Sequence, residues 1–351
     1  MGKVRFGCYL PIPATPVDRL LKIAVLNEEA GFDSLWVPDH VLFQEGIVPE
    51  AWCLLSALAV TTRKVLLGTA VSDPHRYHPV VFAQKVATVS KLSGGRVALG
   101  LGAGEAINLD PLGIDWKIKP VAKMVEAITI MRRLWNGEVL DFEGKFWKLK
   151  NAFLQITPVN NRVPIYLGAN APRTLRLTGE IADGLWSIPL PPQLFRKRFE
   201  MVKEGAEGAG RSIDEIDTGL YLYTAVSERR EEALQRILSF KFRIITSPKV
   251  LSEAGYNVPE DLKSISFFEY LRDPRKAQFL RDRRFSELIP DQAAIDFSIA
   301  GTIEDCIEKI EEYIKAGVRH FLLMNIGPDP RWTLKAYSEK IIPCFRENKH
   351  L

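Results

Sequence analysis

The sequence has few cysteines, and they are not arranged for disulfide bonding or metal binding. Four of the 351 residues are cysteine, at positions 8, 53, 306 and 344, and no two lie close together along the chain. Disulfide frameworks and cysteine-based metal sites need paired spacings, so this scatter argues against both. Each cysteine lies in an apolar segment, where a free thiol behaves as a small hydrophobic group. We therefore expect four reduced cysteines in the core and no metal site.

Long apolar runs and a strong excess of one charge are also missing. No run approaches the roughly 18 apolar residues of a membrane span, and residues 1–5 lead into an expected strand without the apolar core of a signal peptide. The 47 basic and 43 acidic residues give a net charge of +4. That excess is too small to indicate nucleic-acid binding, although it leaves room for a local basic patch. We expect a cytoplasmic protein that binds neither nucleic acid nor membrane.

The elements that are present follow a repeating order. Hydrophobic residues make up 46% and charged residues 26% of the chain, as in ordinary globular proteins. Short apolar runs predict eight strands, and a segment with helical spacing of apolar residues follows each of them. The expected strands cover residues 4–10, 34–38, 65–71, a run that begins at Val97, 164–167, 185–188, 219–226 and 320–325. This alternation predicts an α/β fold, a (β/α)8 TIM barrel.

Two segments interrupt the repeat. Residues 139–142 and 146–149 flank a Glu-Gly-Lys turn, which predicts a small hairpin outside the barrel. Residues 247–294 contain four prolines and a charged run, and they predict a mostly helical insertion after the seventh strand, over the barrel mouth as a lid or a dimer contact. We interpret residues 1–351 as a single domain with 247–294 as an insertion within it.

The stretch from Val97 to Trp116 is the most informative one for function. It begins as an apolar run typical of a buried parallel strand, passes through three glycines and then presents Glu105 and Asn108. A dinucleotide-binding loop would need a third glycine of its pattern at position 105 and a helix that opens at once, but Pro111 follows. A polar loop at the carboxyl end of a barrel strand is the better interpretation.

Other polar residues are expected on the same rim. Asp39 and His40 follow the second strand, and the carboxyl ends of barrel strands form one face on which active sites are built. Each of these residues, and Glu105, also has a purely structural interpretation, as a loop cap, a packing residue or a helix-start carboxylate. Together, a histidine and a carboxylate can supply the acid and base that hydride transfer to or from a carbonyl, imine or alcohol requires.

Five segments carry a family resemblance: WVPDH (36–40), LGTAVSDPHRYHP (67–79), LGLGAGEAINLDPLGIDW (99–116), IYLGANAPRTLRLTGEIADGLW (165–186) and VKEGAEGAGRSIDEID (202–217). They resemble the luciferase-like superfamily, in the branch that uses coenzyme F420, an 8-hydroxy-5-deazaflavin. The likeness covers nearly the whole chain. Within that branch, the methylenetetrahydromethanopterin reductases are the most similar.

The resemblance implies roles for residues on the rim. Asp39 and His40 match the pair beside the deazaflavin ring, with Asp39 near its hydroxyl end and His40 as proton donor or acceptor. Glu105 matches the catalytic acid of the related alcohol and sugar-phosphate dehydrogenases, and Asn108 matches its companion in cofactor binding. A bulge with a non-proline cis peptide behind the ring is implied at Ala70 and Val71. The loop that cradles the phosphate region of the coenzyme is matched by Gly168, Ala169, Asn170 and Ala171.

The implied activity is hydride transfer between C5 of coenzyme F420 and a small-molecule substrate, with reduction of a methylenetetrahydromethanopterin-type pterin as the first choice. An F420-dependent alcohol or ketone oxidoreductase, a luciferase-like monooxygenase that uses FMN, and a non-catalytic flavin-binding barrel are the alternatives. The resemblance and the apolar outer surfaces of the early helices also imply a homodimer.

Departures from the family pattern bear on the substrate. Cys8 and Tyr9 stand where the reductases carry a glutamate, and residues 103–106 differ from their sequence. Basic residues that hold a sugar phosphate have no counterpart at 189–192 or 291–292, so a sugar-phosphate substrate is not expected. A planar pterin would need an aromatic-lined mouth, which could be formed by Tyr9, Phe43, Trp52, Tyr77, Phe267 and Phe268.

Overall fold

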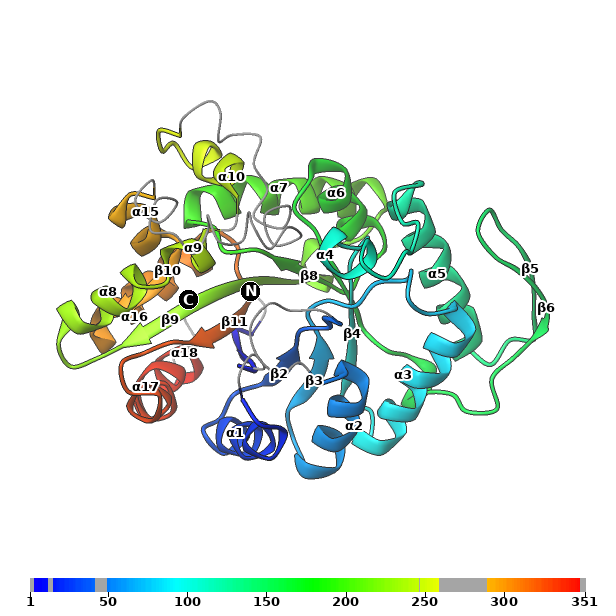
Figure 1. Cartoon of the computed structure of the whole chain (residues 1–351), viewed down its shortest axis with the longest axis horizontal. Coiled ribbons are helices and arrows are strands. Elements are labelled where there is room, and N and C mark those ends of the chain that lie inside the picture. The colour runs from blue at the N-terminus through cyan, green and yellow to red at the C-terminus, as the bar shows by residue number, and fades with distance from the viewer. Residues whose placement is uncertain (1–2, 12–14, 42–48, 246, 259–288, 348–351) are drawn as a thin grey trace.

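Eight parallel strands close into a barrel, which confirms the predicted fold class (Figure 1). The computed structural model describes the chain apart from residues 1–2, 12–14, 42–48, 246, 259–288 and 348–351. In order around the ring, the strands are β1 (Arg5–Tyr9), β2 (Ser34–Val37), β3 (Leu66–Thr69), β4 (Val97–Leu101), β7 (Ile165–Gly168), β8 (Gly184–Ser187), β9 (Asp217–Val226) and β11 (His320–Asn325). β9 pairs with both β8 and β11, and β11 pairs with β1, so the ring is complete.

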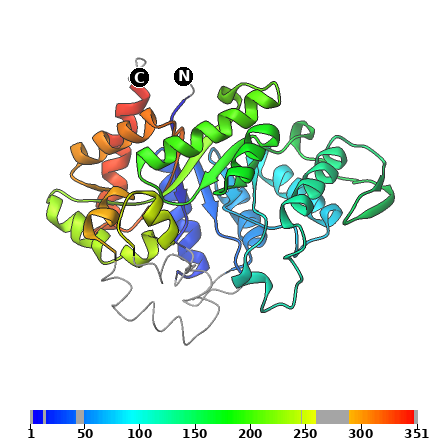
Figure 2. The ribbon, with the colours of Figure 1, turned by 90° about the horizontal axis from the view of Figure 1, so that it is seen from above.

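Helices surround the barrel (Figure 2). They are α1 (Val17–Glu29), α2 (Ala51–Thr61), α3 (Pro79–Ser93), α5 (Pro120–Trp135), α6 (Pro172–Ile181), α7 (Pro192–Gly208), α8 (Arg230–Leu238) and α16 (Ile303–Lys315). Several begin with proline, because the missing N–H of proline has no helical partner in the first turn. α16 begins with a capping box: the Thr302 hydroxyl accepts from the Asp305 N–H, and the Asp305 carboxylate accepts from the Thr302 N–H.

Several elements lie outside the simple repeat. The predicted hairpin is present as β5 (Leu140–Glu143) and β6 (Lys148–Ala152), and both views show it standing away from the barrel beside α5. A short helix, α4 (Ala106–Leu109), follows β4. A strand that the sequence did not predict, β10 (Ser298–Gly301), pairs with the second half of β9 outside the ring. Short 3-10 turns cover Val159–Asn161 and Ile213–Glu215.

The structure describes the predicted insertion in part. α9 (Lys241–Ile244) precedes the insertion, and α10 (Pro248–Glu253) and α15 (Asp291–Asp296) lie within it, while residues 259–288 are outside the described part of the chain. After β11, the chain continues as α17 (Pro330–Ala336), a π-helical turn (Tyr337–Ile341) and α18 (Ile342–Glu347).

Aromatic rings fill the inside of the barrel. Trp36, Tyr166 and Trp186 pack there with ring centroids 4.7–5.4 Å apart. Neighbouring strands make room for them with glycine: a Cβ at Gly68 would lie 2.3 Å from the Trp36 ring, and one at Gly219 would lie 2.3 Å from the Trp186 ring. The barrel is therefore a packed core, and its strands have little freedom to shift.

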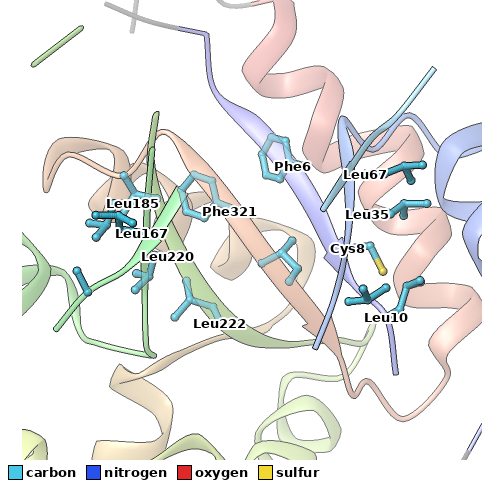
Figure 3. Packing of buried hydrophobic residues seen from close by; sticks show 14 of the residues in the cluster. Phe6, Cys8, Leu10, Leu35, Leu67, Leu167, Leu185, Leu220, Leu222 and Phe321 are labelled. Carbon is cyan, nitrogen blue, oxygen red and sulfur yellow. The ribbon is translucent and has the colours of Figure 1, made fainter. Parts of the chain in front are cut away.

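A second, larger apolar layer lies between the barrel and the helices. Figure 3 shows part of it, including Phe6, Leu35 and Leu67 from three neighbouring strands. Two of the cysteines, Cys8 and Cys306, belong to this layer and are buried. The prediction that all four lie in the core is wrong, because Cys53 is on the exposed side of α2 and Cys344 is only half-buried. Among the described helices, none is long and apolar enough to cross a membrane.

A polar network closes the end of the barrel at which the strands begin. Asp217 Oδ2 accepts from Arg5 at 2.9 Å, Tyr166 at 2.8 Å and His320 at 2.9 Å. The other ring nitrogen of His320 is 2.7 Å from Oγ of Ser34. Although serine, histidine and aspartate stand in line, Ser34 and His320 are fully buried, so no substrate reaches them. The network is structural.

Candidate active site

The polar residues predicted on the rim meet in a cavity of about 350 Å³ at the carboxyl ends of the barrel strands. Loops after β2, β3, β4, β7 and β8 form its walls, and side chains from the barrel interior form its floor. Eight of the ten predicted site residues line it: Asp39, His40, Ala70, Val71, Glu105, Asn108, Gly168 and Asn170. In the described part of the chain, no group of histidine, cysteine or acidic side chains is arranged to hold a metal ion.

Asp39 is buried and hydrogen-bonded through both carboxylate oxygens. Arg76 donates to Oδ1 at 2.9 Å, and the Ser72 hydroxyl donates to Oδ2 at 2.5 Å. The same guanidinium donates through Nε to Asp73 at 2.6 Å. Burial raises the pKa of Asp39, and the charge of Arg76 opposes that rise. Burial also disfavours the Arg76 cation, but the two carboxylates outweigh it and raise its pKa.

Asn108 holds His40 in one orientation. The Asn108 Oδ1 accepts from the Val41 N–H at 2.9 Å, so the amide nitrogen of Asn108 faces Nδ1 of His40, also at 2.9 Å. An amide nitrogen only donates, so Nδ1 of His40 is the acceptor and the neutral ring carries its proton on Nε2. The loop after β4 therefore selects the tautomer of a histidine that follows β2.

Glu105 lies at the cavity edge between the glycine loop and α4. It stands immediately before the first turn of α4, but its side chain makes no capping hydrogen bond there. Burial, Tyr223 and the charge of Glu105 together raise the pKa of Tyr9, a cavity residue of β1. The loop before Glu105 requires glycine, because Gly104 has a φ of 104° and a Cβ there would lie 2.8 Å from Leu109.

The peptide bond between Ala70 and Val71 is cis, as the family resemblance implies. Val71 is packed between two neighbouring strands: a Cβ at Gly102 would lie 2.9 Å from its side chain, and one at Gly168 would lie 3.1 Å away. The next residue, Ser72, is joined to the end of β4, because its carbonyl accepts from the Gly102 N–H at 2.8 Å. Ala70 and Val71 therefore present a fixed apolar wall to the cavity.

The loop after β7 faces the cavity only in part. Gly168 and Asn170 line the cavity, as predicted. Ala169 is buried in the layer under the helices, and Ala171 is exposed immediately before α6, so neither of these two predicted residues lines it. In a turn that leads from a strand into a helix, successive residues point in different directions, and the one-letter pattern does not reveal which of them face the cavity.

Asn170 is oriented by three donors. Its Oδ1 accepts from the Ser187 hydroxyl at 3.1 Å, the Ile188 N–H at 3.3 Å and Arg198 at 2.8 Å. Arg198 is buried and also forms an ion pair with Glu253, at 3.6 Å. Because these donors occupy the oxygen, the amide N–H groups of Asn170 are the part of its side chain that can serve a ligand.

Sequence reasoning missed most of the aromatic wall. Tyr221, Trp186 and Leu322 line the cavity from inside the barrel, and the ring of Tyr221 packs against that of Tyr9 in a tilted arrangement, with the ring centroids 4.8 Å apart. The indole N–H of Trp186 is buried without a hydrogen-bond partner. The sequence holds a partial indication of this wall: Tyr221 and Tyr223 are two residues apart on one strand, so their side chains point to the same side of the sheet.

Of the six aromatic residues predicted at the mouth, three are described by the structure, and one of these three lines the cavity. Tyr9 lines the cavity. Trp52 is buried in the core and donates to the Ser72 hydroxyl at 3.2 Å, while Tyr77 donates to Glu50 at 3.0 Å, so neither lines it. Phe43, Phe267 and Phe268 lie outside the described residues.

Comparison with curated proteins gives relatives that span the whole chain. An F420-dependent glucose-6-phosphate dehydrogenase of Microbacterium testaceum is 32% identical, covering 98% of this chain and 98% of its own length. A 5,10-methylenetetrahydromethanopterin reductase of Archaeoglobus fulgidus is 31% identical, covering 92% of this chain and 94% of its own. Both relatives are oxidoreductases, the first is F420-dependent, and the two differ in their substrates.

Solved structures agree with this result. The F420-dependent tetrahydromethanopterin reductase of Methanopyrus kandleri superimposes with a TM-score of 0.84 at 27% identity, covering 98% of this chain and 100% of the other. An F420-dependent secondary alcohol dehydrogenase in complex with an F420-acetone adduct gives 0.82 at 27% identity, with the same coverage. Residues 4–320 match the luciferase-like monooxygenase family, and the chain belongs to that family.

Proposed function

We propose that this protein is an F420-dependent oxidoreductase that transfers a hydride between the coenzyme and a small-molecule substrate. The observation that carries the proposal is the cavity on the barrel rim, which gathers His40, Glu105 and Asn108 against the apolar wall of Ala70 and Val71. Relatives of this chain at about one-third identity are F420-dependent oxidoreductases along their full length.

The residues of the cavity fit a deazaflavin. A flat ring can rest against the wall made by Val71, and Tyr9, Trp186 and Tyr221 add aromatic surface to the lining. Asp39 would lie beside the hydroxyl end of the ring, while Gly168, Asn170 and the adjoining turn would hold the phosphate region. Ala169 and Ala171 would then support that turn without touching the ligand. When bound, the coenzyme supplies or accepts a hydride at C5.

The side chains around that position would manage the proton that accompanies the hydride. His40, with its proton on Nε2, can donate to an oxygen or nitrogen of the substrate and then recover the proton. Glu105 can act as the partner acid or base, because α4 does not use its carboxylate as a cap. Asn108 would keep His40 in the productive tautomer through the 2.9 Å contact with Nδ1.

For the substrate we propose a methylenetetrahydromethanopterin-type pterin. The Archaeoglobus relative and the Methanopyrus structure support it by their names, and the aromatic wall of Tyr9, Tyr221 and Trp186 suits a planar ligand. The described lining has no lysine or arginine and contains Asp39, Asp73 and Glu105, which disfavours a sugar phosphate. An alcohol or ketone is the second candidate, since Glu105 also fits the likeness to the alcohol dehydrogenase.

The test is to follow the oxidation of reduced F420 by the purified protein. The candidate substrates are a methylene pterin, ketones, imines and the lactone that forms when glucose 6-phosphate is oxidised. Turnover with the pterin alone supports the proposal. Turnover with ketones alone rejects the pterin and leaves an F420-dependent alcohol dehydrogenase. Titration of the apo-protein with F420 and with FMN gives a second check: tighter binding of FMN would indicate the monooxygenase, and no turnover with any donor would indicate a non-catalytic flavin-binding barrel.

The proposal includes a single-domain homodimer in the cytoplasm. Support for the dimer comes from apolar side chains that are exposed on the early helices, among them Leu26, Val60 and Val81. Free thiols at all four cysteines suit a reducing compartment. Light scattering tests the assembly, and a monomer at every working concentration would reject the dimer.

A further inference from the structure

Two tyrosines form a wall that faces Val71 across the cavity. Val71 follows β3, and Tyr221 belongs to β9, which is four places from β3 in the ring of eight strands and therefore opposite it. Tyr9 ends β1, and β11 lies between β1 and β9. All three residues line the cavity. A flat ligand with one face on Val71 therefore turns its other face toward Tyr9 and Tyr221.

Neighbouring rings hold the Tyr9 ring in place. Its centroid is 4.8 Å from that of Tyr221, with an interplanar angle of 51°, and the Tyr221 centroid is in turn 5.3 Å from that of Tyr223. Strand pairing aligns Tyr9 with Trp36, whose side chain is fully buried in the barrel. Tilted and edge-on aromatic pairs are favourable contacts, and rings packed in this way resist displacement. The position of the Tyr9 hydroxyl is therefore set before a ligand arrives.

The Tyr9 hydroxyl has no protein partner in the described part of the chain. Tyr9 is half-buried, and none of the described residues forms a hydrogen bond with its hydroxyl. The side-chain oxygens of Asp39 and Asn108, in the same lining, already accept from protein donors. Burial raises the pKa of Tyr9, and Tyr223 and Glu105 raise it further, so the phenol keeps its proton. A protonated phenol can donate a hydrogen bond to a ligand.

We propose that Tyr9 binds the substrate by donating a hydrogen bond from its hydroxyl to a carbonyl oxygen or a nitrogen beside the carbon that exchanges the hydride. This inference rests on the proposed function, because it takes the ligand against Val71 to be the deazaflavin ring. Hydride transfer requires the substrate to lie on the free face of that ring, which is the space that Tyr9 and Tyr221 bound. Tyr9 thus selects substrates with an acceptor atom at this place, and the Tyr221 ring supplies apolar surface for the rest.

The experiment uses the full-length protein with oxidised F420, which has no hydride to donate, so that a substrate binds without reacting. The probes are methylenetetrahydromethanopterin and cyclohexanone, and coenzyme absorbance reports their binding. Tyr9→Phe keeps the ring and removes the hydroxyl. In this variant, the dissociation constant of the probe that the natural protein binds more tightly should rise by about tenfold, as for the loss of one hydrogen bond. The affinity for F420, measured by tryptophan fluorescence quenching, should not change. Stability in urea should not change either, because the protein loses no internal hydrogen bond.

Tyr337→Phe is the matched control. The Tyr337 hydroxyl is 2.7 Å from that of Thr224, in the layer between the barrel and the helices and outside the cavity lining. This variant should lose stability, because Thr224 loses its partner, and it should keep the natural affinities for both probes.

An unchanged probe affinity in Tyr9→Phe would overturn the inference, as would an equal loss in the control. A tenfold loss of F420 affinity in Tyr9→Phe would also overturn it, because Tyr9 would then contact the coenzyme. Failure of the natural protein to bind F420 would instead overturn the proposed function.

Discussion

At the scale of single residues, the site is built from side chains that constrain one another across different strands. Asn108 fixes the tautomer of His40 through a contact of 2.9 Å, and Arg76 joins Asp39, at 2.9 Å, to Asp73, at 2.6 Å. Such supports hold reacting groups in place before a ligand arrives, which is what acid and base catalysis requires. Substitutions at this scale should therefore separate groups that act on the substrate from groups that hold the coenzyme.

His40→Ala and Glu105→Gln are expected to lower turnover far more than coenzyme affinity. Both side chains would handle the proton of the substrate, and positioned acids and bases typically contribute about 10²–10⁴-fold. Steady-state kcat and the dissociation constant of F420 should be measured on the same preparations. If kcat is unchanged in both variants, these residues have no part in the mechanism.

Asp39→Ala is expected to weaken coenzyme binding and to lower stability. Its removal deprives a buried guanidinium, that of Arg76, of one of two carboxylate partners, and breaking a buried ion pair typically costs about 3–5 kcal/mol. Asp39→Asn is the matched control, since it keeps a hydrogen-bond acceptor of the same shape. F420 affinity and urea unfolding should be compared in the two variants. Full coenzyme affinity in Asp39→Ala would place this residue outside the binding site.

The residues that the sequence made predictable are those on strand ends. Asp39, His40 and Glu105 each follow an apolar run, and a barrel brings such positions to one face. Trp186 and Tyr221 could not be singled out, because they look like ordinary core residues until the ring of strands is known. Ala169 was misjudged for a related reason, since the direction of a side chain in a strand-to-helix turn depends on backbone angles.

At the scale of elements, glycines on the barrel strands determine how closely the aromatic core can pack. Gly68→Ala should destabilise the protein by about 1–3 kcal/mol, because the new Cβ would lie 2.3 Å from a fully buried Trp36 ring. Gly208→Ala is the control: it lies at the end of α7 with no atom within 4 Å of the new Cβ, and it should be neutral or slightly stabilising. Urea unfolding measures both. Equal stabilities would show that the interior can shift to make room.

Element positions were predictable where periodicity was strong and missed where an element was short. The predicted hairpin is present after α5, as β5 and β6. β10 was missed because four residues show no clear period, and its pairing with β9 depends on contacts distant in sequence. The π-helical turn at Tyr337–Ile341 was also missed, since the spacing of its apolar residues resembles that of an ordinary helix.

At the scale of the whole molecule, the closed barrel followed from counting strands. Eight alternating units left few alternatives to a ring of parallel strands, and the whole-chain family resemblance agreed with it. The sequence did not reveal how the ring is sealed at the end opposite the site. Arg5, Tyr166, Asp217 and His320 come from four different strands, and only the closed ring brings them into contact.

The hydrogen-bond network around Asp217 predicts how the stability of the fold depends on pH. Burial alone would raise the pKa of Asp217, but His320, Arg5 and Tyr166 outweigh it and lower the pKa from 3.8 to about 2. A carboxyl whose pKa is lower in the folded state binds its proton more readily when unfolded. Its stabilisation is therefore complete above about pH 5 and is lost as the pH falls from about 4 to about 2. A difference of about two pKa units corresponds to about 2–3 kcal/mol.

The measurement is urea unfolding of the natural protein and of Asp217→Asn at a series of pH values between 6 and 3. The natural protein should be the more stable of the two near neutral pH, because Asn cannot pair with Arg5. As the pH approaches 3, the natural protein should lose stability faster than the variant, so the difference between them narrows. A difference that stays constant over this range would mean that the Asp217 carboxylate titrates alike in the folded and unfolded chains. In that case hydrogen bonding and packing, with no contribution from charge, would hold the closed end of the barrel together.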